Sequence, residues 1–326
     1  MRAVIATEPG GPDVLAVVER PDPEPGPGEV LVAVDAAGVN RADLLQREGR
    51  YPPPPGASDV LGLEVAGRVV GLGAGVERWA VGDAVCAVVP GGGYAELAVV
   101  AEATAMPLPP GLDPVAAAAV PEAFSTAWDN VVRRGGLGRG ETLLVHGGAS
   151  GVGTAALQLG VRAGAQVLAT ASTAAKRRTC EELGAARTID YTSEDFVAVV
   201  DEVTDGRGVD VVLDLVGGAY LDRNLRSLAL EGRLVVIALQ GGARAELDLA
   251  RLLTRRLAVM GSTLRARGLA ERSELARDLV SRVWTGFADG ALRPVVDRVR
   301  PLEEVAEAHA RMAAGEHIGK LVLAVR

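Results

Sequence analysis

Residues 143–158, LLVHGGASGVGTAALQ, decide the fold that we expect for this chain. The apolar run at the start is typical of a buried strand, and the glycine-rich run at 147–153 permits a tight turn. The alanine-rich stretch that follows predicts a helix. The order strand, glycine-rich turn and helix predicts one unit of a parallel sheet.

The sequence around this turn continues the same alternation. Further strands are predicted at 166–170, 209–215, 233–239 and 258–263, and helices at 155–163, 174–183, 196–204, 224–229 and 247–255. Alternation of strands and helices over this length predicts an α/β fold with a doubly wound parallel sheet, as in a Rossmann domain. We expect this domain to cover residues 122–266.

The two flanking parts of the sequence have a different character. Residues 1–121 contain short apolar runs between Gly and Pro clusters, at 30–34, 60–70, 84–89 and 94–100. This pattern predicts a β-rich domain, a small barrel or sandwich. The C-terminal part predicts a helix at 270–287, a strand at 295–300, a helix at 303–314 and a strand at 320–325.

Composition and charge argue against several classes of function. Apolar residues make up 48% of the chain, so a sizeable core can form, and the net charge of −8 argues against nucleic acid as the main partner. Cys86 and Cys180 are too few for a disulfide framework or a four-thiolate zinc site. Without a membrane-length apolar run or a signal-peptide pattern, we expect a cytoplasmic protein with no membrane partner.

The glycine-rich turn predicts a dinucleotide site. Its glycines let the backbone approach a pyrophosphate, and the helix that follows offers N–H groups at Gly151 and Val152. Ser150 occupies the second glycine position of the usual dinucleotide pattern, where a small polar residue still permits close approach. The alternative is a structural turn in an α/β domain that binds another ligand.

The end of the second predicted strand favours NADPH over NADH. Sites for NADH carry an acidic residue there, about 20 residues after the turn, whereas residues 168–173, LATAST, contain none. Ser172, followed by the cations Lys176 and Arg177, suits a 2′-phosphate, and Tyr191 is expected near the same phosphate. Lys176 is also one of only two lysines among 34 basic residues, which favours a role for its compact charge. The alternative is a solvated first turn of a helix.

Seven further motifs occur together with the glycine-rich turn. They are VNRADL at 39–44, GRY at 49–51, PPPGAS at 53–58, LGLEVAG at 61–67, VPEA at 120–123, DLVGG at 214–218 and IGKLVL at 318–323. With them the chain resembles the zinc-free, zeta-crystallin-like quinone oxidoreductase branch of the medium-chain dehydrogenase/reductase superfamily. Within that branch it is most similar to the tumour-suppressor-inducible quinone oxidoreductases. The resemblance implies a GroES-like catalytic domain made from residues 1–121 and 267–326, and a homodimer.

The resemblance also bears on zinc. The alcohol dehydrogenases of the superfamily hold a catalytic zinc with a Cys and a His, and the matching positions here are Asn40 and Leu63, neither of which is a useful ligand. We therefore expect no metal site. Without a Lewis acid, oxidation of an alcohol is disfavoured. Reduction of a conjugated carbonyl, which is already electrophilic, needs less polarisation and is the more suitable reaction.

The resemblance suggests which residues carry the chemistry. Asn40 is expected near the nicotinamide, where it would hold a substrate oxygen, and Tyr51 is the best candidate donor to the carbonyl oxygen. Ser150 is expected close to the Tyr51 loop and to the cofactor. The alternatives are a helix cap for Asn40 and pocket lining for Tyr51; Asp43 is expected to be a structural partner within its turn.

Further cofactor contacts follow from the resemblance alone. Thr126 matches a position at the nicotinamide ribose, and Leu239, Gly241 and Leu264 match strand ends that bind the carboxamide. Gly217 belongs to the motif after the third predicted strand of this domain, at 209–215. Lys320 matches a cation that reaches the cofactor phosphates, and a pairing with Glu64 would tie the two domains together at the cofactor.

The function that we expect is NADPH-dependent reduction of quinones or related conjugated carbonyls by hydride transfer. One alternative is an enoyl-thioester or enone reductase of the same superfamily, which needs a longer pocket and a basic patch for the carrier arm. Another is a non-catalytic NADPH-binding protein that acts as a sensor or binds RNA, although the acidic charge weakens the RNA version.

Overall fold

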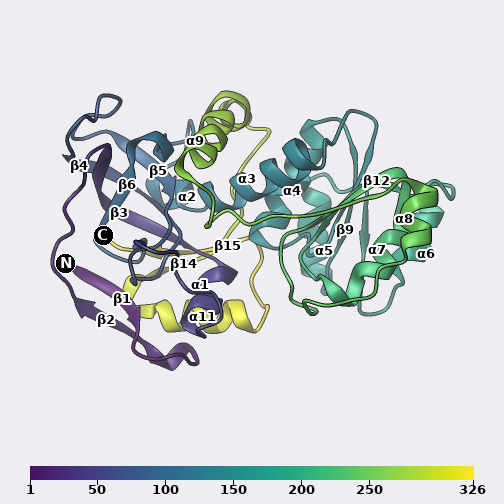
Figure 1. Cartoon of the computed structure of the whole chain (residues 1–326), viewed down its shortest axis with the longest axis horizontal. Coiled ribbons are helices and arrows are strands. Elements are labelled where there is room, and N and C mark those ends of the chain that lie inside the picture. Colours follow the sequence, from purple (N-terminus) through teal and green to yellow (C-terminus); the bar gives the residue numbers. More distant parts are fainter. The chain divides into compact units, whose positions relative to one another are not determined.

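The computed structural model describes all 326 residues, which form two compact units (Figure 1). The terminal unit consists of Met1–Ser125 and Leu264–Arg326, and the central unit consists of Thr126–Thr263. The domain limits predicted from the sequence, at 121/122 and 266/267, stay a prediction. No helix in the structure combines the length and the apolar character that a membrane crossing requires.

The central unit contains one six-stranded parallel sheet. Its strands are β8 (Thr142–Val145), β9 (Gln166–Thr170), β10 (Arg187–Ile189), β11 (Val209–Asp214), β12 (Leu228–Val236) and β13 (Ala258–Gly261). They pair in the order β10-β9-β8-β11-β12-β13. Counted from β8, this is the order 3-2-1-4-5-6 of a Rossmann fold, so the predicted fold class is confirmed.

Helices connect these strands and cover the sheet. They are α4 (Gly151–Arg162), α5 (Ala174–Glu182), α6 (Phe196–Val203), α7 (Leu221–Ser227) and α8 (Leu249–Arg255). One core cluster includes Leu144, Leu168 and Ile189 from three strands and Phe196 and Val200 from α6. Continuous apolar strands of this kind are expected of a parallel sheet that is buried on both faces.

Two predictions about element bounds were wrong. The strand predicted at 233–239 begins earlier, at Leu228, so the helix predicted to end at residue 229 ends at Ser227. The first half of β12 was hidden because Glu231, whose φ is 63°, and Gly232 resemble a turn. The short edge strand β10 was not predicted.

The terminal unit contains the β-rich part of the chain. One sheet has the order β14-β15-β3-β4-β5-β7, with β6 also paired to β3. Its strands are β3 (Glu29–Val39), β4 (Glu64–Leu72), β5 (Ala84–Val88), β6 (Leu97–Ala101), β7 (Met106–Pro107), β14 (Val296–Pro301) and β15 (Lys320–Ala324), and β1 (Arg2–Ala6) and β2 (Leu15–Glu19) form a separate hairpin. Strand β15, from the end of the chain, pairs with β3, so both chain ends build one sheet.

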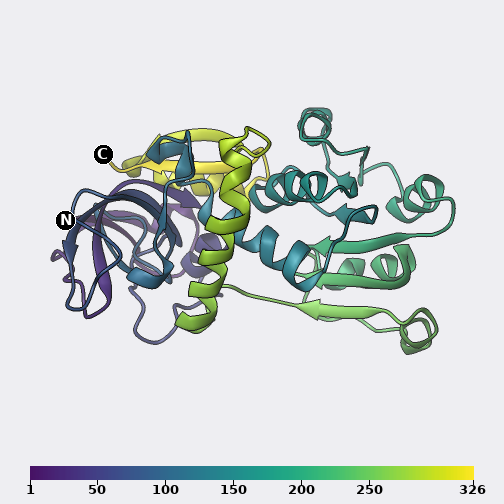
Figure 2. The same cartoon turned by 90° about the horizontal axis from the view of Figure 1, so that it is seen from above.

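The helices of this unit are short, although α9 and α10 continue one another. They are α1 (Arg41–Arg47), α2 (Pro114–Ala117), α3 (Pro121–Ala127, which ends in the central unit), α9 (Leu269–Asp278), α10 (Trp284–Ala288) and α11 (Val305–Ala313). Figure 2 shows α9 and α10 as one rod, joined by wide π-helical turns at Leu279–Val283. The single helix predicted at 270–287 describes this rod.

A buried polar chain joins α1 to α11 inside the terminal unit. The Tyr94 hydroxyl donates to Asp43 Oδ2 over 2.8 Å, and His309 Nε2 lies 3.4 Å from the same hydroxyl. Arg47 Nη1 lies 3.4 Å from His309 Nδ1. Because the guanidinium can only donate, Nδ1 is the acceptor and Nε2 carries the proton of a neutral ring. Burial lowers the pKa of His309 to about 3.

Replacement of His309 by Gln is expected to remove a pH-dependent part of the stability. The pKa of His309 in the folded protein lies below its ordinary value of 6.5, so the unfolded chain binds more protons than the folded chain as the pH falls below 6.5. The difference in free energy of unfolding between wild type and His309→Gln is expected to shrink by about 1–2 kcal/mol from pH 7.5 to pH 5. Urea unfolding at both values measures this difference, and a constant difference would contradict the neutral histidine.

Candidate functional site

The glycine-rich turn has the backbone geometry that close packing requires. Gly147 has φ of +62°, a conformation that side chains disfavour. A Cβ on Gly148 would lie 2.7 Å from the Cβ of Ala169, and a Cβ on Gly153 would lie 2.3 Å from the carbonyl oxygen of Gly147. These glycines therefore let β8, β9 and the first turn of α4 pack closely together.

The N-terminus of α4 offers unpaired backbone donors. Ser150 is the N-cap, and its Oγ accepts the N–H of Gly153 over 3.0 Å. The N–H groups of Gly151 and Val152, the first two helical residues, have no acceptor within the chain. Two such donors at the positive end of a twelve-residue helix suit an anionic phosphate. The geometry therefore fits a pyrophosphate, with Ser150 engaged in holding the turn.

A buried chain of hydrogen bonds holds the turn at the end of β8. The Thr170 hydroxyl lies 3.2 Å from both the N–H of Gly147 and His146 Nδ1. His146 Nε2 lies 2.7 Å from Asn224 Oδ1, so Nε2 carries the proton and Nδ1 accepts. Burial lowers the pKa of His146 to about 4, which keeps the ring neutral. His146 is thus a structural residue of the turn.

The end of β9 carries hydroxyl and cationic residues without an acid. Ser172 and Lys176 are partly buried, and Thr173 caps α5 by accepting the N–H of Lys176. Arg177 pairs with Asp190 over 2.6 Å. Lys176 stays a predicted cation for a 2′-phosphate. Tyr191, which follows Asp190, is 45% exposed.

The predicted loops after β11 and β12 meet in the central unit. Gly217 has φ of 80°, and its N–H donates to Asp214 Oδ2 over 3.0 Å. The N–H of Gly241 donates to the carbonyl of Val216 over 2.7 Å. Leu239 lies in the same loop and is 56% exposed. Gly217, Leu239 and Gly241 are therefore brought together at the carboxyl ends of two adjacent strands, where ligands bind in such sheets.

Asn40, Lys320 and Glu64 form a buried cluster in the terminal unit. The Lys320 ammonium donates to the Val39 carbonyl over 2.8 Å and to Asn40 Oδ1 over 2.6 Å, and it lies 2.5 Å from Glu64 Oε1. Asn40 Nδ2 donates to the same Glu64 oxygen over 3.0 Å. These contacts occupy all three ammonium donors, so a phosphate would have to displace one of them.

This cluster corrects one prediction. Lys320 and Glu64 belong to the same unit, so their pairing joins strands β15 and β4 and does not tie two domains together. Asn40 is indeed the N-cap residue of α1, and its N–H donates to Asp43 Oδ2 over 2.7 Å. Its side chain, however, turns to Glu64 and Lys320. Asp43 is a structural partner of the turn, as expected.

The Tyr51 loop is held by an arginine that the sequence did not single out. The Arg265 guanidinium lies 5.3 Å from the centre of the Tyr51 ring. It donates to the carbonyls of Pro90 and Tyr51, over 2.8 and 3.2 Å, and to Gln46 Oε1 over 2.7 Å. Burial raises the pKa of the Tyr51 phenol, and Glu122 acts in the same direction. Tyr51 is therefore a protonated donor at neutral pH.

Glu122 is the second residue to which the sequence assigned no role. It belongs to the quoted VPEA motif and follows Pro121 at the start of α3. Its N–H donates to Glu64 Oε2 over 2.8 Å. Burial and the charge of Glu64 raise the pKa of the Glu122 carboxyl to about 8. Only the motif could have indicated it, because the burial and the neighbouring charges arise from the fold.

Two further residues were predicted to contact the cofactor, Leu264 and Thr126. Leu264 is 7% exposed and lines a small cavity of about 20 Å³ in the terminal unit, beside Arg272 and Leu275. Thr126 is in the central unit, where its carbonyl accepts from Asn130 Nδ2 over 2.8 Å. Both keep their predicted cofactor roles as predictions.

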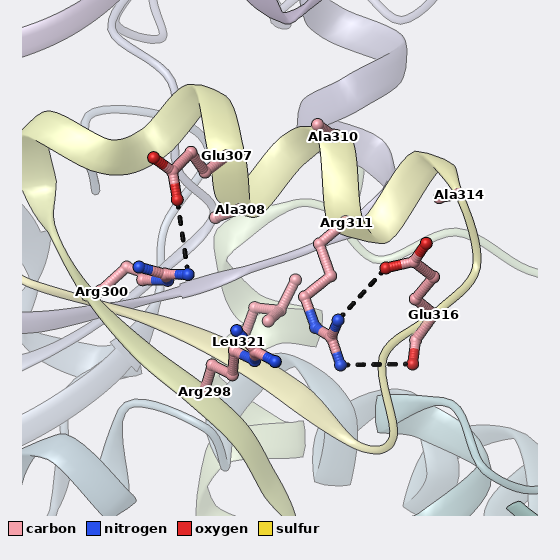
Figure 3. Close-up of a pocket in the computed structure, with 9 residues that line it drawn as sticks. All are labelled: Arg298, Arg300, Glu307, Ala308, Ala310, Arg311, Ala314, Glu316 and Leu321. Carbon is pink, nitrogen blue, oxygen red and sulfur yellow. Dashed lines mark hydrogen bonds and ion pairs between the residues drawn. The ribbon is translucent and has the colours of Figure 1, made fainter.

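A larger cavity, of about 380 Å³, lies between α11 and strands β14 and β15 (Figure 3). Arg300 and Arg311 line it, and each is paired with a carboxylate. Leu321 lies on its floor, whereas Lys320 is the neighbouring residue on β15 and points to the opposite face of the sheet. The cavity is therefore separate from the Asn40 cluster.

Comparisons with known proteins identify the family. Residues 26–110 match the alcohol dehydrogenase GroES-like domain, and residues 183–323 match a family model described as zinc-binding dehydrogenase. A quinone oxidoreductase from Lama guanicoe is 31% identical over 331 residues, which cover all of this chain and 98% of that protein. The chain belongs to the medium-chain dehydrogenase/reductase superfamily. The predicted membership of this superfamily, with quinone oxidoreductases among its relatives, is confirmed, whereas the absence of zinc and the subgroup stay predictions.

Other relatives of this dehydrogenase/reductase are larger. A phthioceranic/hydroxyphthioceranic acid synthase from Mycobacterium tuberculosis is 37% identical over 326 residues, which cover 99% of this chain but only 15% of the synthase. This chain therefore spans less than a sixth of that relative.

Solved structures of the superfamily resemble this one closely. Escherichia coli quinone oxidoreductase complexed with NADPH has a TM-score of 0.88 and 29% identity, with 99% of both chains covered. The apo form of JamJ enoyl reductase has a TM-score of 0.89 and 26% identity, with 100% of this chain and 99% of that chain covered.

The residues of this dehydrogenase/reductase do not fit a zinc ion, despite the description of the family model. No three His, Cys, Asp or Glu side chains are grouped so that they could hold a metal. Asn40 is bonded to Glu64 and Lys320, and Leu63 is 2% exposed in the core.

Replacement of Arg265 by Lys is expected to loosen the Tyr51 loop. Lysine cannot reproduce three hydrogen bonds from a planar fork, so the free energy of unfolding is expected to fall by about 1–3 kcal/mol. Trypsin is expected to cleave after Arg50 faster than in wild type. The control is Arg298→Lys, which makes the same change at an exposed position on β14. If both variants changed stability and trypsin cleavage equally, Arg265 would not be holding the Tyr51 loop.

Proposed function

We propose that this superfamily member catalyses NADPH-dependent reduction of quinones or related conjugated carbonyls. The observation that carries the proposal is the pair of half-buried groups Tyr51 and Asn40, held by Arg265 and Lys320 without any metal ligand. A protonated phenol is a suitable donor to an oxygen that gains negative charge during hydride transfer. The quinone oxidoreductases among its relatives support the choice of acceptor.

The cofactor proposal rests on the central unit. Gly151 and Val152 would bind the pyrophosphate, and Ser172, Lys176 and Tyr191 would surround the 2′-phosphate. The remaining proposed contacts are Thr126, Ser150, Gly217, Leu239, Gly241 and Leu264, with Lys320 acting through Asn40. Bound NADPH supplies the hydride. A neighbouring quinone oxidoreductase structure contains NADPH, which supports the same choice here.

The protein's own residues would then handle the acceptor oxygen. Tyr51 Oη would donate a proton or a hydrogen bond to it, and Asn40 would orient it through the amide that Lys320 and Glu64 fix. Holding these donors in place before reaction reduces the reorganisation that the transition state requires. Ser150, in the central unit, stays a predicted catalytic residue, and its hydroxyl already accepts the Gly153 N–H.

A second candidate is reduction of an α,β-unsaturated thioester. It is favoured by the likeness to JamJ enoyl reductase and to a much larger acid synthase. The same Tyr51 donor would serve an enolate oxygen. A non-catalytic NADPH-binding role is the third candidate, and turnover separates it from the other two.

We also propose that two copies of the chain form a homodimer in the cytoplasm. The outer edge of β13 has no partner strand within the chain, and Val259 is 40% exposed on it. Leu249 and Leu253 on the adjacent α8 are 60% and 75% exposed. Such a combination of open sheet edge and apolar surface is usually covered by a second chain.

Replacement of Lys176 by Glu is expected to raise the Kd for NADPH by about 100-fold and to change the Kd for NADH by less than about threefold. The reason is that only NADPH carries the 2′-phosphate. Fluorescence titration measures both constants. Arg178→Glu makes the same charge change on an exposed part of α5 and is the control; an equal loss for both cofactors would contradict the assignment of Lys176.

NADPH oxidation with 9,10-phenanthrenequinone, an α,β-unsaturated ketone and crotonyl-CoA tests the function. We expect the quinone to be reduced at the highest kcat/KM, with no loss on adding EDTA. Tyr51→Phe is expected to lower kcat by about 10–100-fold while the Kd for NADPH stays unchanged. Preference for crotonyl-CoA would favour the second candidate, and tight NADPH binding without any turnover would exclude both reductases.

A further inference from the structure

Arg265 is a buried cation without a carboxylate partner. The buried arginine and lysine residues of the terminal unit are Arg47, Arg265 and Lys320, with exposed fractions of 3%, 7% and 4%. Two of them pair with a glutamate, Arg47 with Glu48 over 3.1 Å and Lys320 with Glu64 over 2.5 Å. Arg265 forms hydrogen bonds but no ion pair. Burying a charge without a counter-charge is costly, so proteins seldom leave one in this state.

The hydrogen bonds of Arg265 all go to neutral oxygens. They reach two backbone carbonyls, including that of Tyr51, and the side-chain amide of Gln46, over 2.7–3.2 Å. The carboxyls of Asp43 and Glu122 act on the guanidinium only at longer range. The hydrogen bonds therefore fix the position of the guanidinium but leave its charge without a direct counter-charge.

The side chain that meets this charge is the Tyr51 ring. The guanidinium carbon of Arg265 lies 5.3 Å from the ring centre, within the range of a cation–π contact. The Tyr51 side chain is partly buried, so water alone would solvate an ionised phenol poorly. A phenol that has lost its proton carries negative charge, which a cation at this distance attracts. A Tyr51 phenolate would therefore supply the counter-charge that Arg265 lacks.

We propose that Arg265 stabilises the phenolate that Tyr51 forms when it protonates the acceptor. The acceptor gains a hydride from NADPH, and its oxygen takes the proton of Tyr51 Oη, so one O–H bond forms as another breaks. The phenolate is held beside the guanidinium until it takes a proton from water. In sum, the acceptor gains one hydride and one proton. Arg265 is a positioning residue that acts through Tyr51 and does not itself touch the acceptor.

Two replacements separate the charge of Arg265 from its hydrogen bonds. Arg265→Gln removes the charge and keeps an amide donor, whereas Arg265→Lys keeps the charge and loses the planar fork. The inference rests on the proposed reductase function, and it predicts that kcat with the quinone falls about 10–100-fold in Arg265→Gln but less than about fivefold in Arg265→Lys. The Kd for NADPH is expected to stay unchanged in both variants. An equal or larger loss in Arg265→Lys would overturn the role of the charge.

A double-mutant cycle tests whether Arg265 acts through the phenol. In a Tyr51→Phe background, Arg265→Gln is expected to lower kcat by less than about threefold, because no phenolate is left to stabilise. Losses that multiply in the double variant would overturn the inference. Arg298→Gln, which removes the charge of an exposed arginine in the same unit, is the control and is expected to match wild type in kcat.

Ionisation of the Tyr51 phenol gives a readout without turnover. The chain has four tyrosines, so NMR of protein with carbon-13-labelled tyrosine rings, compared with Tyr51→Phe, identifies the Tyr51 signal. Arg265→Gln is expected to lower the acid dissociation constant of this phenol by about tenfold or more, and Arg265→Lys by less than about threefold. Glu122, the other charged group that acts on the phenol, is the same in all these proteins. An unchanged titration in Arg265→Gln would contradict the proposal.

The outcomes separate this inference from the proposed function. A wild type that reduces the quinone, with unchanged kcat and unchanged phenol titration in Arg265→Gln, would overturn the role of Arg265 and leave the reductase function intact. A wild type that reduces no acceptor would overturn the reductase function and, with it, the role of Arg265.

Discussion

The buried ion pair between Glu64 and Lys320 is the interaction on which the terminal unit depends. It joins the start of β4 to the start of β15, residues that lie 256 positions apart in the chain, and Asn40 and the N–H of Glu122 bind the same carboxylate. Removing one partner of such a pair leaves an uncompensated buried charge, which commonly costs 3–5 kcal/mol. The pair therefore sets the position of α1 and α3 together.

The backbone around the pair is adapted to it. A Cβ on Gly38 would lie 2.2 Å from Glu64 Oε1 and 2.6 Å from the carbonyl of Ala118, so only glycine fits there. The room that Gly38 leaves allows the carboxylate to approach β3, where the Val39 carbonyl holds Lys320. The negative charge of Glu64, which Lys320 pairs with, also raises the pKa of the Glu122 carboxyl. The same ion pair therefore affects both the packing of this unit and the charge state of Glu122.

Local patterns predicted the central unit well. The turn at 147–153 and the missing acid after β9 are properties of contiguous residues, and the doubly wound parallel sheet followed from the alternation of strands and helices. Long-range groupings were less accessible. Arg265 meets Gln46 and Pro90 across 219 and 175 positions, and no spacing in the sequence encodes such a contact. Glu122 was visible as part of a motif, but its raised pKa depends on burial and on charges from four other segments of the chain.

The scarcity of lysine has a consequence for chemical modification of this protein. One of its two lysine side chains, Lys320, is 4% exposed and bonded to three oxygens, so its amine is protected. The other, Lys176, is only partly buried, at the start of α5. Among the side chains, amine-directed reagents acting on the folded protein would therefore modify Lys176 alone, and a fluorophore placed there would report on the proposed binding of the cofactor.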